Sequence, residues 1–250
     1  NQLMLVDVTT GHEQEVYRTN KLLFHGETCF AEDGKSIVFD EWNDQRLAHL
    51  ASLNLEDKKI TKVTKGAEGK QDIAPVYSPD FKKLAFLRQS SLAAGEIMIL
   101  DLETQEISQL TNDGKNIQGI CWGKDANSIV FSSNRTGRRL LWEVEIQSRR
   151  VSAINGVGAK AYHPRFHAKS NTLLYTAEQI QSNIWLYDVE SMNERTTPVI
   201  SSTVSDFDAK WSPDGKRIAF VSERDGNHQL WVCNADGTSP RKVTQLDSGY

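Results

Sequence analysis

A ten-residue phrase that recurs at a nearly constant interval is the feature that most constrains how this chain can fold. Its clearest copy is Trp211–Phe220, W-S-P-D-G-K-R-I-A-F. Asp-Gly between two extended apolar segments is a strong hairpin signal, because glycine readily adopts the positive φ of a tight turn. Weaker copies begin at four other aromatic residues, so the leading aromatics are Phe30, Tyr77, Trp122, Phe166 and Trp211. Their spacings of 47, 45, 44 and 45 residues predict a repeat protein.

Each repeat contains four short segments of alternating polarity, separated by turn residues. In the last repeat the hairpin phrase is followed by the extended segments Gln229–Asn234 and Arg241–Thr244. Polar and apolar residues alternate with a period of two residues nearly everywhere. No amphipathic helix pattern of useful length is present. Four strands in about 45 residues are typical of one β-propeller blade. The sequence therefore predicts an all-β fold, a β-propeller of four-stranded blades.

The repeat also sets the predicted boundaries of the blades. A single propeller domain covers residues 1–250, with a half blade at 1–20 and the start of a closing strand at 246–250. We expect six blades in the ring, the closing blade being incomplete in this chain, because pairing both termini in one sheet removes an open edge. A seven- or eight-bladed parent is the alternative. The five complete blades, called the first to fifth repeats below, are expected at about 21–66, 67–114, 115–158, 159–203 and 204–245.

Several repeats depart from the Ser-Pro-Asp-Gly turn. Phe81 replaces the turn glycine in the second repeat, Gly123-Lys124 replaces Ser-Pro in the third, and His167-Ala168 does so in the fourth. We expect these hairpins to use different turns. Where the third strand of a repeat enters its turn, a short polar side chain can bond nearby backbone. This position holds Asp7, Asn54, Asp101, Glu145, Asp188 and Asn234.

Three tryptophans, Trp142, Trp185 and Trp231, share one position in the third strand of their repeats. We expect them to fill space between neighbouring blades, a more favoured role than ligand stacking. The three cysteines, Cys29, Cys121 and Cys233, are expected to be buried free thiols that pack as small apolar residues.

Charge and motifs exclude several functions. The net charge is −4 with signs interspersed, which does not predict a nucleic-acid surface. No apolar run is long enough to span a membrane, and no leader is evident at residue 1. The chain has no G-x-S-x-G elbow, no H-E-x-x-H, no phosphate loop and no short-range metal-ligand pair. We therefore expect no enzymatic activity, no cofactor and no metal ligand within this chain.

The variable residues just before each leading aromatic are the candidate binding site. First strands line the channel of a propeller, so these residues are expected at one rim of the channel. The rim is polar and net acidic, which suits a cationic or amine-bearing group, a peptide end or a metal ion; the alternative is a merely solvated rim. A histidine pair there would respond to pH between about 5 and 8. The candidates are His25, Glu27, Asp72, Gln118, Tyr162, His163, Asp206 and Asp208.

The third repeat is locally basic. Its arginines are Arg135, Arg138, Arg139, Arg149 and Arg150. A solvated edge is the favoured interpretation, and a partner site is the alternative.

The last repeat resembles a known family. Trp211–Gly226, followed by Leu230-Trp231 and Asn234–Gly237, is similar to the TolB-type propeller repeat, and weaker likeness extends over essentially all of the chain. Asn183–Trp185 with Pro198–Thr203 is similar to the extracytoplasmic propeller of CadC-type regulators, in which a winged helix and a membrane helix precede the propeller. Similar phrases also occur in free periplasmic propellers and in prolyl peptidases.

The resemblance implies a non-enzymatic binding or sensor propeller in the periplasm, with a protein partner or small ligand at the channel mouth and no nucleic acid contacted by this domain. Any membrane attachment would come from a flanking segment. Two alternatives stay open: a free TolB-like scaffold protein, and the propeller of a serine peptidase whose hydrolase domain lies elsewhere.

Overall fold

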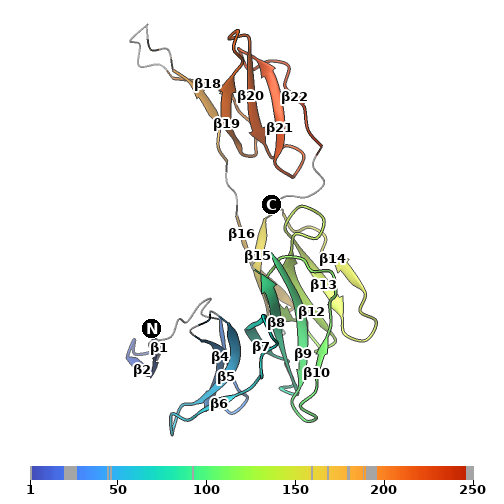
Figure 1. Ribbon diagram of the computed structural model, residues 1–250. Coiled ribbons are helices and arrows are strands. Elements are labelled where there is room, and N and C mark those ends of the chain that lie inside the picture. Colours follow the sequence, from blue (N-terminus) through green and yellow to red (C-terminus); the bar gives the residue numbers. More distant parts are fainter. Residues whose placement is uncertain are drawn as a thin grey trace. The chain divides into compact units, whose positions relative to one another are not determined.

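Every regular element among the residues that the computed structural model describes is a β-strand, as the alternating sequence predicts (Figure 1). The chain divides into two compact units: Asn1–Arg135 with Leu140–Thr176, and Thr136–Arg139 with Ala177–Tyr250. Within the described part, no helix has the length and hydrophobicity needed to cross a membrane. The structure describes residues 2–19, 27–43, 45, 47–91, 93–158, 160–167, 169–178, 181–187, 189 and 196–245.

The first unit contains three four-stranded antiparallel sheets, one for each of the first three repeats, and the strands of each sheet lie in chain order. Figure 1 shows this order for the second sheet. The first sheet is β3 (Thr28–Phe30), β4 (Ser36–Trp42), β5 (Ala48–Asn54) and β6 (Ile60–Lys62). The second is β7 (Gln71–Tyr77), β8 (Lys83–Ser91), β9 (Ala94–Asp101) and β10 (Ile107–Gln109). The third is β11 (Ile117–Trp122), β12 (Ser128–Ser133), β13 (Leu140–Glu145) and β14 (Val151–Ala153). Two hairpins complete the unit: β1 (Gln2–Val6) with β2 (Glu13–Arg18), and β15 (Ala161–His167) with β16 (Thr172–Ala177).

The second unit contains the rest of the fourth repeat and the fifth. One hairpin pairs β17 (Ile184–Leu186) with β18 (Thr197–Ile200). The fifth repeat is a four-stranded sheet of β19 (Asp206–Trp211), β20 (Arg217–Ser222), β21 (Gln229–Asn234) and β22 (Arg241–Lys242). The described strands of the fourth repeat are the hairpins β15–β16 and β17–β18, and its predicted four-stranded sheet stays a prediction. The expected six-bladed ring stays a prediction.

The closing aromatics of the hairpin phrase form the centre of each sheet. Phe39, Phe86, Phe131 and Phe220 are all at most 1% exposed. Burial of such a side chain stabilises the fold by roughly 1.5–3 kcal/mol. Trp122, a leading aromatic, is also buried and donates its indole N–H to the carbonyl of Val76 at 2.9 Å. This bond joins the first strand of the third repeat to the first strand of the second.

The hairpin turns of the first, second, third and fifth repeats place a left-handed residue at the same position, with or without glycine, whereas in the fourth repeat it is Asn171, one position later. The fourth residue after the leading aromatic has positive φ in the first, second, third and fifth repeats: Gly34 +65°, Phe81 +53°, Ala126 +57° and Gly215 +68°. Phe81 donates its N–H to Ser78 O at 2.9 Å, as Gly215 does to Ser212 O. The prediction of different turns is therefore wrong for the second and third repeats. The strand ladder on both sides of the turn imposes this geometry, and the left-handed residue bears the conformational strain. Ala168 lies outside the described residues.

The predicted bonds between a polar side chain and nearby backbone are present at three of the five described third-strand turns. Asp7, Asn54 and Asp101 each accept two backbone N–H bonds, from the residues two and three positions later, at 2.8–3.3 Å. Glu145 instead bonds Ser148 and Arg150 through its longer side chain. Asn234 donates to Thr238 Oγ1 at 2.9 Å, and Asp188 lies outside the described residues.

The three tryptophans do not share one environment. Trp142 and Trp231 are half-buried, and each lies opposite a buried closing phenylalanine on the neighbouring strand of its sheet. Trp185, in the hairpin β17–β18, is 56% exposed, and its predicted packing between neighbouring blades stays a prediction.

The cysteines are unpaired and covered to different degrees. Cys121 and Cys233 are buried, and Cys29 is half-buried. Burial raises the pKa of Cys29 and of Cys121 to about 12, so both side chains pack as neutral thiols.

Candidate functional site

A bulge in the first strand shapes the region where the sequence placed a binding site. The third residue before the leading aromatic is left-handed in four repeats: Ala74 has φ +55°, Gly119 +85°, His163 +46° and Asp208 +53°. The ladders β7–β8, β11–β12 and β19–β20 shift register at this point. Such a bulge leaves one residue unpaired and turns its side chain in a new direction. In these repeats, the variable residues that the sequence analysis selected therefore lie at or beside a bulge of the first strand.

The bulge regions of distant repeats meet within the first unit. The first strands β3, β7, β11 and β15 contact one another in turn. Glu27, which holds the bulge position of the first repeat, lies 3.5 Å from His163, which holds it in the fourth (Oε1 to Nδ1). Arg165 Nη2 lies 3.4 Å from the same Glu27 oxygen. We call Glu27, Asp40, His163 and Arg165 the Glu27 cluster.

Asp40 gives the cluster a buried second carboxyl group. It follows Phe39, which pairs with Thr28 in the β3–β4 ladder, so Asp40 lies on the rung beside Glu27. The residue is 3% exposed, and Trp42 donates its indole N–H to Oδ2 at 2.6 Å. Burial, with a smaller contribution from the negative charge of Glu27, raises the pKa of Asp40 to about 7. Its charge therefore changes near neutral pH.

Sequence reasoning did not select Asp40, because it lies on the second strand and not in the stretch before a leading aromatic. The available signal was an aspartate inside the apolar run Ile37–Trp42. Arg165 was also missed, although it lies two residues after His163. Its Nη1 donates to Pro164 O at 2.9 Å and to Ile120 O at 3.4 Å, which holds the guanidinium between β15 and β11.

Close packing fixes the position of His163. A Cβ atom on Gly119 would lie 2.7 Å from the Cα of His163, so the bulges of the third and fourth repeats are in backbone contact. The ring of Tyr162 stacks on the His163 ring with a centroid distance of 6.3 Å. Gln118 is exposed in the same bulge, directly before Gly119.

Asp72 lies in an ion pair inside the second sheet. The residue is 0% exposed, and its two carboxylate oxygens accept from Arg88 Nε at 2.7 Å and from Nη2 at 3.0 Å. The Arg88 guanidinium also lies 5.5 Å from the ring centroid of Phe86. The bidentate pair occupies both oxygens of Asp72, so this carboxylate links β7 to β8.

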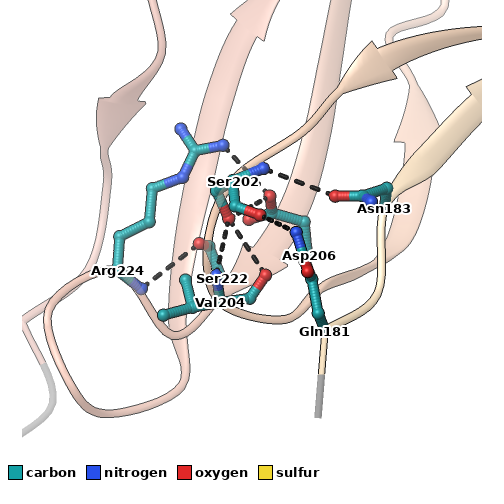
Figure 2. Close-up of polar contacts among 7 residues, drawn as sticks. All are labelled: Gln181, Asn183, Ser202, Val204, Asp206, Ser222 and Arg224. Carbon is teal, nitrogen blue, oxygen red and sulfur yellow. Dashed lines mark hydrogen bonds and ion pairs between the residues drawn. The ribbon is translucent and has the colours of Figure 1, made fainter. Parts of the chain in front are cut away.

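Asp206 has a related arrangement in the second unit, as Figure 2 shows. Its Oδ2 accepts from Ser202 Oγ at 2.7 Å and from Arg224 Nη2 at 3.1 Å. Gln181 Nε2 bonds the Ser202 carbonyl at 2.6 Å, and Ser202 N bonds Asn183 Oδ1 at 3.4 Å, so β19 is tied to the preceding hairpin (Figure 2). Asp208, at the bulge, is exposed and pairs with Lys210 at 3.2 Å.

The structure thus brings together Glu27, Tyr162 and His163 of the predicted rim, with Gln118 beside them, and adds Asp40 and Arg165. Asp72 is committed to Arg88. Asp206 and Asp208 belong to the second unit, and His25 lies outside the described residues. Among the residues that the structure describes, no three His, Cys, Asp or Glu side chains converge as a metal site requires.

Comparison with known proteins gives the family. The family model described as the TolB beta propeller domain, PD40, matches residues 1–206. The Tol-Pal system protein TolB of Francisella tularensis is 23% identical over 227 residues, 88% of this chain and 51% of that protein. An uncharacterized peptidase of Bacillus subtilis, YuxL, is 35% identical over 69 residues, 27% of this chain and 10% of that protein. The chain therefore spans about half the length of the TolB relative and a small part of the peptidase.

Solved structures share the fold. TolB from Acinetobacter baumannii has a TM-score of 0.59 and 16% identity, covering 99% of this chain and 60% of that chain. An oligogalacturonate lyase from Vibrio parahaemolyticus has a TM-score of 0.51 and 20% identity, covering 97% of this chain and 72% of that chain. The repeated hairpin phrase, the four-stranded sheets and the family match over most of the chain agree, and the chain belongs to the TolB β-propeller (PD40) family.

Proposed function

We propose that this chain is a non-catalytic binding propeller, and that it recognises a protein partner through a cationic or amine-bearing group at the Glu27 cluster. The observation that carries the proposal is the meeting of Glu27 with His163 and Arg165, from repeats far apart in the sequence. A partner of the chain is also consistent with its likeness to a TolB protein named for the Tol-Pal system.

The charges and exposures of the cluster suit such a ligand. The Glu27 side chain is 19% exposed, whereas the side chains of His163 and Arg165 are 54% and 51% exposed. An incoming ammonium or guanidinium group can therefore approach the well-held Glu27 carboxylate between these two more exposed side chains. Asp40 adds a second negative charge behind Glu27 once its carboxyl ionises near pH 7. Two carboxylates in a partly desolvated site attract a cation more strongly than one exposed carboxylate does.

The cellular setting of this binding is a separate part of the proposal. The likeness of Asn183–Trp185 and Pro198–Thr203 to CadC-type regulators supports a sensor domain on the outer side of the cytoplasmic membrane. A free periplasmic scaffold of the TolB kind is the second possibility. The third is the propeller of a serine peptidase, which the 35% identity to YuxL over 69 residues favours.

The flanking reading frame separates these settings. A winged helix and membrane helix upstream support the sensor, a signal peptide supports the scaffold, and a downstream G-x-S-x-G domain supports the peptidase.

A peptide titration tests the binding itself. The probe is Ac-Gly-Lys-Gly-NH2, with norleucine in place of lysine as the uncharged comparison, and binding is followed by NMR at pH 7.5. We expect shifts at His163 and Arg165 with the lysine peptide alone, and about tenfold weaker binding in Glu27→Gln, because a hydrogen bond to a charged group is lost. Glu32→Gln, an equal charge change in the exposed turn after β3, is the control. Equal binding of the norleucine peptide, or equal loss in both variants, contradicts the proposal.

A further inference from the structure

A cavity of about 520 Å³ lies between the second and third sheets, and none of its lining residues belongs to the Glu27 cluster. It opens where the chain leaves β10 toward β11. Its volume falls within the range of small-molecule sites, roughly 300–1,000 Å³. Its lining includes Leu110, Asn112, Asp113, Arg135, Arg149 and Val151.

Two walls of this cavity are held rigidly. The Arg135 guanidinium pairs with Asp113 and lies over Phe131 and Trp142, with ring centroids at 5.3 and 5.2 Å. Its side chain is 14% exposed. Leu110 donates its N–H to Ile97 O at 2.8 Å, so the end of β10 is fixed against β9. A cavity with walls of this kind is largely formed before any ligand arrives, which lowers the entropic cost of binding.

The cavity carries one positive charge that is not neutralised. Asp113 balances Arg135, and the neighbouring Arg150 pairs with Glu145. Arg149 has no carboxylate within ion-pair distance in the part of the chain that the structure describes. Leu110 and Val151 provide an apolar surface in the same cavity. A guanidinium beside an apolar wall suits a ligand with one carboxylate and an apolar body.

The combination is particular to the third repeat. Arg149 holds the left-handed position of its turn, with φ +56°, and the same position is Lys58 in the first repeat and Gln105 in the second, with φ +59° and +61°. Arg135 is the fourth residue after the closing aromatic. The first two repeats have Asn43 and Ser90 there, whereas the fifth has Arg224, which also pairs with an aspartate and lies over two aromatic rings. The turn recurs along the chain, and so does the paired arginine, but Arg149 and the rest of the cavity lining at this junction do not follow from the repeat.

We propose that this cavity binds a small monocarboxylate, whose carboxylate bonds Arg149 and whose apolar body contacts Leu110 and Val151. A dianion such as phosphate is disfavoured, because Asp113 places a negative charge in the same lining. The site would give the propeller a second ligand, independent of the Glu27 cluster.

The test is an NMR titration of the chain with N-acetyl-L-leucine, with N-acetyl-L-leucinamide and inorganic phosphate as comparisons. We expect saturable shifts of the Leu110 and Val151 methyl groups and of the Trp142 indole with the carboxylate. The amide keeps the same apolar body without the charge, so we expect its binding to be about tenfold weaker or undetectable. Equal binding of the amide, equal binding of phosphate, or shifts confined to other residues would overturn the assignment.

Arg149→Gly is the decisive variant, because glycine suits a left-handed position and the change removes the guanidinium without straining the turn. Gln105→Gly makes the same backbone change in the second repeat and is the matched control. We expect about tenfold weaker binding of N-acetyl-L-leucine in Arg149→Gly and unchanged binding in Gln105→Gly. Glu27→Gln is also expected to leave this binding unchanged, which separates the result from that of the proposed partner site. Wild-type affinity in Arg149→Gly would refute the role of that residue.

Discussion

Glu27 and His163 hold the same position in the first and fourth repeats, and the carboxylate of one lies 3.5 Å from the imidazole of the other. The contact depends on the first strands β3, β7, β11 and β15, which lie against one another in turn through the first unit. A site assembled in this way uses one residue position from several repeats. Its chemistry can therefore change by substitution at that position while the strand ladders stay as they are.

Asp40→Asn is expected to change how stability depends on pH. The folded-state pKa of Asp40, about 7, lies above the value of 3.8 for an exposed aspartate, so the folded state binds the proton more tightly. The stability that this group contributes is full below pH 3.8 and is lost as pH rises through 7. Relative to wild type, Asp40→Asn should gain about 2 kcal/mol between pH 5.5 and pH 8.

Urea unfolding at the two pH values measures this difference. Asp57→Asn, in the exposed turn after β5, serves as the control and should show no comparable gain. An Asp40→Asn variant whose stability relative to wild type is the same at pH 5.5 and pH 8 would show that Asp40 is ionised throughout.

Gly119→Ala is expected to be more destabilising than a change at an equally left-handed turn glycine. At Gly215 a Cβ would meet nothing within 4 Å, so Gly215→Ala should cost only the backbone strain, about 1 kcal/mol. At Gly119 the new atom would also lie 2.7 Å from the His163 backbone, which should add about 1–3 kcal/mol. Chemical denaturation of both variants makes the comparison. Equal losses would mean that β11 and β15 can separate freely.

The Asp72–Arg88 pair is expected to show strong coupling in a double-mutant cycle. Removing one partner leaves the other charge buried, so Asp72→Ala or Arg88→Ala should each cost about 3–5 kcal/mol. The double variant should lose much less than the sum of the two. Lys210→Ala breaks the exposed pair with Asp208 and should cost below about 1 kcal/mol. Additive losses at Asp72 and Arg88 would indicate that the pair does not stabilise the sheet.

Cys29 and Cys121 are expected to resist alkylation while the chain is folded. Burial raises the pKa of both thiols to about 12, so the reactive thiolate is scarce at pH 8. Mass spectrometry after iodoacetamide treatment should show modification of these residues at the rate of unfolding. Rapid labelling of either cysteine in the absence of denaturant would contradict the burial.

Much of the fold can be predicted from the sequence, because the period-2 pattern and the aromatic pair of each phrase recur at a fixed interval. The conformations of the turns are harder to predict from the sequence. Gly34 and Gly215 correctly indicate a left-handed residue in the turn, but Phe81 and Ala126 adopt the same conformation without any local preference for it. The ladders on either side impose that conformation on them.

The first-strand bulge likewise cannot be predicted from the local sequence. Its left-handed position is occupied by Ala74, Gly119, His163 and Asp208, which share no local signal. Nor does the sequence show that Asp72 is bound by Arg88, since the pairing depends on the register of β7 against β8.

The sequence by itself determined the all-β class, the repeat and its strands, and the position in each repeat from which a site could be built, because these depend on local turn chemistry and alternating burial. Only the tertiary structure decided which of those residues meet. Glu27 and His163 are joined because the first strands pack against one another, and Asp40 titrates near neutrality because the surrounding sheet removes it from water. Long-range packing and desolvation have no signature in any single stretch of the chain.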